Sequence, residues 1–147
     1  MTEASAVPSV ETALLCDDVR REISGKDIII GVYGDEAIVP NFPVFMMFSL
    51  YLRVRFPEQG MFPTEFRVLG PSGQPLTANV KAPMMTTAAN RIAMVHIAGL
   101  PIQVQSAGEV QFQWHPPGGE WETIQTLKVK QGEIKSGAVN VLHMSNA

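Results

Sequence analysis

The strongest hydrophobic pattern in the chain lies in the segment VFMMFSLYLRVRFP, residues 44–57. Apolar and polar side chains alternate there with a period of two, which is the repeat of a β-strand that buries one face. We predict a strand whose buried face carries Phe48, Leu50, Leu52, Val54 and Phe56 and whose other face carries Ser49, Tyr51, Arg53 and Arg55. One side of its sheet should cover a core and the other should meet solvent.

Shorter segments repeat this alternation between turn-forming residues, among them the turns GPSGQP and PPGG. Proline cannot donate to a strand ladder, so Pro40 and Pro43 make IVPNFPVF an extended crossing and not a central strand. Gly99 and Pro101 interrupt another apolar segment. The further predicted strands are residues 65–68, 76–80, 90–104, 109–115 and 120–131.

Residues 13–34, ALLCDDVRREISGKDIIIGVYG, fit two structures. Val19 and Ile23 stand four residues apart, as they would on one face of a helix. The three consecutive isoleucines that follow are typical of a strand, because β-branched side chains suit a pleated surface. Gly25 can supply the positive φ of a tight turn between two strands. We predict a β-hairpin whose solvent-facing charges are Asp18, Arg20 and Glu22.

These elements predict an all-β fold: an antiparallel β-sandwich, immunoglobulin-like or C2-like, of about seven to nine strands with frequent turns between them. A closed barrel is the alternative, because the pattern does not fix the topology. We expect residues 1–10 to be a flexible arm, residues 11–130 to be the single sandwich domain, and residues 131–147 to be a tail or an extra strand.

Composition narrows the class of protein. The 147 residues include 46% hydrophobic and 17% charged side chains, with a net charge of -3, which argues against general nucleic-acid binding. No apolar run is long enough for a membrane helix, and the N-terminus lacks the features of a secretory signal. A single cysteine, Cys16, cannot form an internal disulfide. We therefore expect a cytoplasmic protein with no nucleic-acid or membrane partner.

Several motifs together resemble one family. The chain carries CDDVR at 16–20, Glu22, Gly25-Lys26, IGVYG at 30–34 and PNFP at 40–43, and the later segments FRVLGPSGQPL and GEVQFQW are similar in style. Over roughly residues 12–130 the chain resembles DUF6941, a family of small bacterial and phage-associated proteins. The resemblance implies a β-sandwich. It implies no activity, and it supplies no catalytic residue to carry over.

Catalytic and metal-binding chemistry have weak support in the sequence. Cys16 precedes Asp17 and Asp18, and neighbouring carboxylates raise the pKa of a thiol and so make it a poorer nucleophile. A divalent cation could bind at Asp17, Asp18, Asp35 and Glu36 if the ends of the hairpin lie close together. His96, His115 and His143 lack the spacing of metal ligands. We expect no enzyme, no catalytic residue, no cofactor and no resident metal, and keep a divalent-metal-binding module as an alternative.

Two surface features suggest binding to a protein partner or to a second copy. Tyr51, Arg53 and Arg55 share one face of the best strand, and Arg67 would extend this patch if it lay on a neighbouring strand; the alternative is an ordinary solvated face. Methionines cluster near the proline-rich bends and could fill the core or form a contact surface. The predicted protein-binding residues are Tyr51, Arg53, Arg55, Arg67, Met46, Met84 and Met85. The predicted function is a non-enzymatic protein-binding or self-assembling module. The alternative is a phage or particle component that assembles through strand edges. Either could form homo-oligomers.

Overall fold

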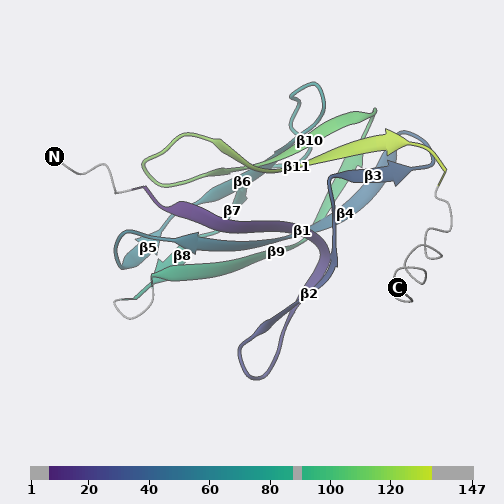
Figure 1. Ribbon diagram of the computed structural model, residues 1–147. Coiled ribbons are helices and arrows are strands. Elements are labelled where there is room, and N and C mark those ends of the chain that lie inside the picture. Colours follow the sequence, from purple (N-terminus) through teal and green to yellow (C-terminus); the bar gives the residue numbers. More distant parts are fainter. Residues whose placement is uncertain (1–6, 88–90, 134–147) are drawn as a thin grey trace.

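Eleven strands make up the described part of the chain, residues 7–87 and 91–133 of a computed structural model. Among these residues there is no helix, and none therefore that could cross a membrane. The strands form two main sheets that pack face to face, with a small strand pair at one end (Figure 1). The predicted β-sandwich is confirmed, and its sheets are open, unlike those of a closed barrel. The immunoglobulin-like and C2-like arrangements stay predictions.

The first sheet has the order β2-β1-β4-β9, and all its neighbours are antiparallel. Its strands are β1 (Ser9–Arg21), β2 (Asp27–Val32), β4 (Val44–Arg55) and β9 (Ile92–Val104). The predicted hairpin of residues 13–34 is confirmed as β1 and β2. The predicted long strand is confirmed as β4, which lies inside this sheet between two antiparallel strands of 13 residues each.

The second sheet has the order β3-β11-β10-β6-β7, and its β3–β11 pair is parallel. Its strands are β3 (Glu36–Val39), β6 (Glu65–Leu69), β7 (Val80–Lys81), β10 (Gly108–His115) and β11 (Glu122–Gln131). The small pair consists of β5 (Gly60–Phe62) and β8 (Met84–Thr86). The crossing predicted from its prolines connects β3 in the second sheet to β4 in the first.

The core lies between the two sheets and follows the predicted alternation. On β4 the buried positions are Phe48, Leu50, Leu52 and Val54, followed by Phe56; on β10 they are Val110, Phe112 and Trp114; on β11 they are Leu127 and Val129. The Phe48 ring connects the layers, because its centroid lies 5.1 Å from that of Tyr33 and 5.4 Å from that of Phe112. Along one side, Gln125 Nε2 of β11 donates a hydrogen bond to the Ala13 carbonyl of β1 (2.9 Å).

Three details differ from the sequence prediction. Residues 76–80 were expected to form a strand, but only Val80 enters one. After the tight turn the chain pairs with β6 only briefly, through the Leu69–Pro75 bridge and a bond from Leu76 N–H to the Val68 carbonyl (2.8 Å), and it pairs again at Val80. Residues 92–104 form one strand through Gly99 and Pro101, with an irregularity in its pairing opposite Ser49. Ser49 belongs to the polar face of β4 but is buried.

The first and last strands extend slightly beyond the expected domain boundaries at residues 11 and 130. β1 begins at Ser9, inside the segment expected to be an arm, and β11 ends at Gln131. Residues 1–6 of the expected arm and residues 134–147 of the expected tail lie outside the described residues.

Candidate interaction surface

The β1–β2 hairpin, residues 16–32, projects from the first sheet on the side away from the second sheet (Figure 1). Its turn is closed by two backbone hydrogen bonds: Glu22 N–H donates to the Lys26 carbonyl (2.8 Å) and Gly25 N–H to the Glu22 carbonyl (2.9 Å). Gly25 has a φ of 92°, which glycine adopts without strain. The residue types at the turn therefore account for its geometry, as the sequence predicted.

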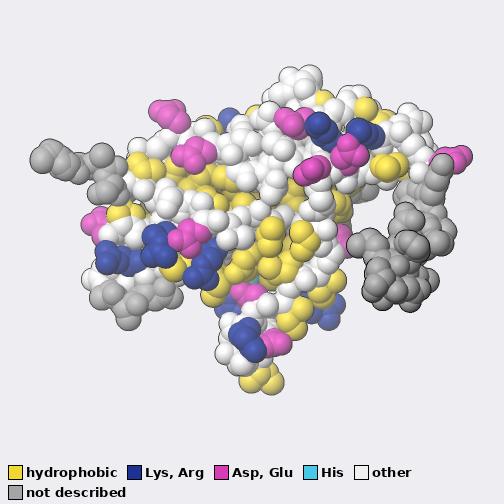
Figure 2. Space-filling view, in the orientation of Figure 1, with side chains coloured by type: hydrophobic (Ala, Val, Ile, Leu, Met, Phe, Trp, Pro, Cys, Tyr) yellow, Lys and Arg dark blue, Asp and Glu magenta, His cyan; other side chains and the backbone are white. Residues whose placement is uncertain are grey.

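One face of β2 is apolar and exposed. Ile28, Ile30 and Val32 retain 42%, 42% and 54% of their accessible surface. Their partners on β1 are Arg20, Asp18 and Cys16, respectively. β2 is the outermost strand of its sheet, and among the described residues it pairs with β1 alone. Figure 2 shows hydrophobic side chains at the tip and along one side of the projecting hairpin.

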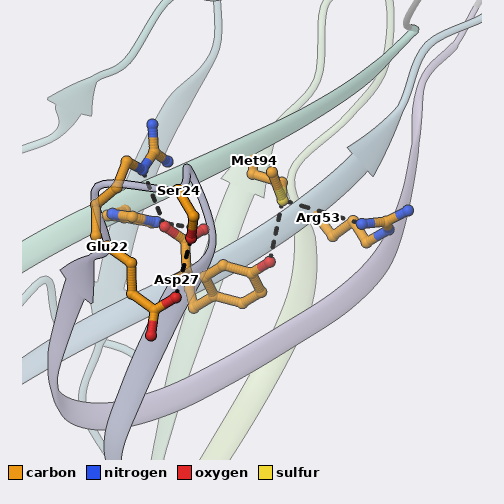
Figure 3. A network of polar contacts seen from close by, with 8 residues as sticks. Glu22, Ser24, Asp27, Arg53 and Met94 are labelled. Atoms are coloured by element: carbon orange, nitrogen blue, oxygen red, sulfur yellow. Dashed lines mark hydrogen bonds and ion pairs between the residues drawn. The ribbon is translucent and has the colours of Figure 1, made fainter.

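Asp27 makes one polar contact within the hairpin and one with the opposite edge of the sheet. Asp27, the first residue of β2, accepts a hydrogen bond from Arg21 Nε (3.0 Å), and its other carboxylate oxygen lies 3.1 Å from His96 Nε2 on β9. β2 and β9 are the two opposite edges of the first sheet, so this contact requires the hairpin to curl over the face of the sheet. Figure 3 shows Asp27 beside the turn residues Glu22 and Ser24, with the contact between Met94 and Arg53 to one side.

The Asp27 carboxylate is enclosed. Only 6% of its side chain is exposed, and apart from their 3.1 Å contact its Oδ2 atom and His96 Nε2 have no polar partner within the described part of the chain. Burial raises the pKa of the Asp27 carboxyl, but the interactions with Arg21 and His96 outweigh burial, so the pKa lies below its usual range. The carboxylate is therefore kept ionised and holds the hairpin in place.

Cys16 and Ser49 lie side by side where the hairpin leaves the sheet. Cys16 Sγ donates to the Ser49 carbonyl (3.7 Å), and Ser49 Oγ donates to the Asp17 carbonyl (3.2 Å). Burial above all, and the nearby Asp17 and Asp18 carboxylates, raise the pKa of the Cys16 thiol, although the Asp18 backbone N–H lowers it. A buried thiol with a raised pKa is a weak nucleophile, which supports the structural interpretation of this residue.

The structure brings Tyr51, Arg53 and Arg55 together on the face of β4 that points away from the core. Both arginines bind Glu11 of β1, with Nε–carboxylate distances of 3.2 Å for Arg53 and 2.5 Å for Arg55. The hydrogen bonds from these arginines lower the pKa of the Glu11 carboxyl. Tyr51 O–H donates to Met94 Sδ (3.3 Å). This arginine face thus already carries its own counter-charge.

Arg67 does not join that face. It lies on β6 in the second sheet, where its Nε donates to Gln113 Oε1 (2.8 Å) and its guanidinium covers the Trp121 ring at 4.0 Å. The alternation correctly predicted that Arg67 points away from the core. It could not predict the sheet to which the strand belongs, because both sheets have a polar outer face.

The three predicted methionines have different environments. Met84 is 2% exposed and packs in the core, so it cannot form part of an accessible rim. Met85, next in the chain, is 67% exposed and pairs with the equally exposed Met61 across β5 and β8. Met46 is half-buried against the core. The alternation of a strand explains why adjacent methionines take opposite roles.

The comparison with known protein families supports the sequence resemblance. The model of a family of unknown function, DUF6941, matches residues 11–130. The chain belongs to DUF6941. No curated protein matches the chain.

The acidic residues of the hairpin do not converge in this DUF6941 chain. Within the described residues, no group of three or more His, Cys, Asp or Glu side chains is arranged to hold a metal ion. Asp18 forms an ion pair with Arg20 (3.0 Å), and the Asp17 side chain lies against Gly31. The residues that sequence reasoning missed are Asp27 and His96: no local pattern relates them, because they meet only when the hairpin curls over the sheet.

Proposed function

We propose that this DUF6941 protein is a non-enzymatic module that binds an extended polypeptide segment at the free edge of β2. The observation that carries the proposal is the exposed apolar row Ile28, Ile30 and Val32 on an edge strand. An added strand gains main-chain hydrogen bonds from the edge, and its alternate side chains gain contacts with such a row. The fitting partner is therefore an extended segment with apolar side chains at every second position.

The backbone of β2 offers the hydrogen bonds that such a partner needs. Hydrogen-bonded and non-hydrogen-bonded pairs alternate along an antiparallel ladder. The bond between Glu22 and Lys26 fixes this alternation, so the backbone groups of Ile28 and Ile30 point to β1. Those of Asp27 and Ile29 point away from it and are directed at the free edge. The alternation ends at Gly31, which has a φ of 68°, and Tyr33 N–H beyond it donates to the Leu15 carbonyl of β1 (2.9 Å).

This edge is the least protected of the long sheet edges. Proteins usually blunt an edge strand with lysine, proline, a bulge or short length. β9 contains Pro101 and a register irregularity, β7 has 2 residues and β3 has 4. From Ile28 to Val32, β2 has neither a charge nor a proline. A strand that leaves such an edge uncovered is well suited to receive a partner.

The hairpin is also held in a defined position before binding. The Arg21–Asp27 ion pair joins its two strands, and the Asp27–His96 contact attaches it to β9. Association then costs less ordering of the chain than it would for a free loop. The arginine face is less favoured, because Glu11 already pairs with Arg53 and Arg55 and a partner would have to replace those interactions.

A capture experiment with matched variants tests the proposal. The tagged protein, the hairpin variant Ile28→Lys/Ile30→Lys and the control Ile38→Lys are exposed to the host lysate and to an untagged copy of the chain. Ile38 is 45% exposed on β3, so it matches the hairpin isoleucines in residue type and exposure. The wild type and Ile38→Lys should retain the same protein, and the hairpin variant should lose it.

The retained protein is then purified and its affinity for each variant is measured directly. We expect a loss of at least about tenfold for the hairpin variant, equivalent to about 1.4 kcal/mol. Thermal unfolding must show that all three proteins are folded. Equal binding by the folded hairpin variant and the wild type would contradict the proposal.

Assembly into a particle is the second candidate function. The observation that favours it is the length of β9, 13 residues, at the opposite edge of the same sheet. A sheet that is free at both edges could be extended in both directions. Light scattering of the purified protein would then show growth beyond a dimer as concentration rises, whereas binding at β2 alone would not produce it.

A further inference from the structure

We propose that residues 138–142, AVNVL, pair with the first half of β4 in the same molecule and add a further strand to the first sheet. The observation that carries the inference is a vacant side of β4: residues 44–48 have a strand neighbour on one side only within the described chain. This side is separate from the free edge of β2, so the inference does not rest on the proposed function.

The vacant side begins where β1 leaves β4. The last pair between the two strands is Cys16 with Ser49, whereas β9 continues beside β4 as far as Val44. The next carbonyl of β1, that of Asp17, accepts a hydrogen bond from the Ser49 hydroxyl (3.2 Å), and β1 then departs into the hairpin. Residues 44–48 therefore have β9 as their only paired strand in the part of the chain that the structure describes.

The backbone groups on the vacant side belong to Phe45 and Met47. The Leu15 carbonyl accepts its backbone hydrogen bond from the side of β1 opposite to β4 (2.9 Å), so the next residue, Cys16, faces β4 and its partner Ser49 faces β1. The pairing irregularity opposite Ser49 places its extra residue on β9, so β4 keeps its own alternation. Met47 and Phe45 therefore direct their N–H and C=O groups to the same side as Ser49, where no described strand receives them.

The core is incompletely covered at the same place. Val44 and Met46 point to the core but are only half-buried, whereas Leu50, on the same face and beside β1, is 1% exposed. Phe48 is fully buried because the Tyr33 ring packs against it, with 5.1 Å between the ring centroids. A strand with an apolar inner face would therefore gain burial beside the first residues of β4.

Residues 138–142 have the composition of such a strand. Val139 and Val141 are β-branched and stand two residues apart, so in a strand they share one face. The parity that places both valines on the inner face, beside Met46, leaves Asn140 on the outer face in contact with solvent. A shift by one residue would bury the asparagine, so the pattern itself selects this parity.

The segment is long enough to reach the vacant side. Gly132 N–H donates to the Val39 carbonyl (2.9 Å), so the described chain ends beside the end of β3 (Figure 1). Val44 is five residues after Val39, and five residues span at most about 18 Å. Ala138 is six residues after Gly132, and six residues span up to about 20 Å. The segment can therefore enter beside Val44, and it then runs parallel to β4.

Hydrogen exchange of the full chain, followed for single amides by NMR, tests the added strand. The amides of Phe45 and Met47 should exchange slowly in the wild type, because hydrogen bonds to the segment protect them. The variant Val139→Asp/Val141→Asp places two charges on the inner face of the segment. Both amides should then exchange at least about tenfold faster. Equal exchange rates in the wild type and this variant would overturn the inference.

Two controls make the result specific. Met46 and Phe48 face β9, so their amides should stay protected in every variant and report that the sheet is folded. The matched variant Asn146→Asp/Ala147→Asp adds the same two charges beyond the segment and should exchange as the wild type does. Faster exchange of the vacant-side amides in this matched variant would attribute the effect to charge and would also overturn the inference.

Protein concentration distinguishes the occupants of the vacant side. A segment of the same molecule protects the two amides equally at every concentration, because its effective concentration is fixed by the chain. Protection that increases with concentration would mean that the segment of a second copy is bound there, and it would overturn the pairing within one molecule.

A nitroxide label tests the direction of the segment. Cys16 is the only native thiol and is buried, so a label at Ser145→Cys is specific. In the parallel orientation this label follows the segment and should broaden the amide resonance of Ser49 more than that of Val44. A label at Lys135→Cys, before the segment, should do the reverse. The opposite result from the two labels, or no broadening from either, would exclude the parallel strand.

Discussion

Asp27 on β2 and His96 on β9 join the two opposite edge strands of the first sheet through a 3.1 Å contact between carboxylate and imidazole. The pairing of neighbouring strands does not create this contact. It exists because the hairpin curls over the sheet, and it places an enclosed acid at the base of the proposed binding edge. The position of that edge should therefore depend on the ionisation of Asp27.

Replacement of Asp27 should make the free energy of unfolding less sensitive to acidic pH. The pKa of Asp27 is lowered in the folded state, so its stabilisation is present above the usual Asp pKa and is lost as the pH falls through the folded value. We expect Asp27→Asn to lower the free energy of unfolding by about 1–3 kcal/mol at pH 7. Below pH of about 4 the difference from the wild type should shrink.

Urea unfolding from pH 7 to pH 3, followed by the fluorescence of buried Trp114, measures this effect. Asp18→Asn is the matched control, because the pKa of Asp18 is also lowered, chiefly by Arg20, but its ion pair is exposed. The control should have a much smaller effect. Equal stability of Asp27→Asn and the wild type at pH 7 would show that the Asp27 contacts do not hold the hairpin.

Cys16 should be unreactive in the folded protein. Its thiol is buried and its pKa is raised by burial, so little thiolate is present at neutral pH and reagents cannot reach it. Labelling with a maleimide at pH 7 should be at least about a hundredfold slower in the native state than in urea, as expected for a group that reacts only through the unfolded fraction. Rapid native labelling would mean that the hairpin opens frequently.

Gly31→Ala should destabilise the hairpin more than Gly73→Ala. Both glycines have positive φ, 68° and 83°, so alanine is strained at either position by about 1–2 kcal/mol. At Gly31 the new methyl group would also overlap the Asp17 carboxylate, whereas at Gly73 it would meet no atom. Chemical denaturation should show the larger loss for Gly31→Ala. Equal losses would mean that the Asp17 side chain moves aside freely.

Phe48→Ala should be among the most destabilising changes. Phe48 is fully buried between Tyr33 and Phe112, and its loss leaves a cavity between the two sheets. We expect a cost of about 3–5 kcal/mol. Phe45→Ala on the same strand is the control: Phe45 is exposed, and its removal should change stability by less than about 0.5 kcal/mol. Similar costs at both positions would contradict the assigned core.

The arginine face should tolerate neutral substitutions better than charge reversal. Arg53→Glu/Arg55→Glu places two carboxylates beside Glu11 and should lower the melting temperature, while Arg53→Gln/Arg55→Gln removes the ion pairs without adding repulsion. The glutamine variant is therefore the cleaner test of whether this face binds a partner. If it retains the sedimentation behaviour of the wild type and the same captured protein, the arginine face is not the binding site.

Local pattern predicted much of the fold. The alternation on β4 identified Phe48, Leu50, Leu52 and Val54 as buried residues, because a strand with one buried face imposes a period of two. The turn at Gly25 was predictable because few residues accept positive φ. The small β5–β8 pair was not, since three-residue strands leave no periodic signal.

The candidate site was less predictable. The exposure of Ile28 and Ile30 cannot be read from their residue type, because three isoleucines in a row are usually buried. The placement of Arg67 depended on which sheet receives β6, and the contact between Asp27 and His96 depends on how far the hairpin curls. These relationships arise from the packing of distant segments, which the order of residues along a strand does not encode.

The parallel pairing of β3 with β11 has a consequence for synthesis. Residues 36–39 have β11 as their only strand neighbour within the described chain, yet residues 122–131 are translated much later. At about 5–20 residues per second, the nascent β3 waits for seconds without its neighbour. On the ribosome, the second sheet is therefore completed last, and a translation pause before residue 122 should prolong the period in which β3 can pair with other nascent chains.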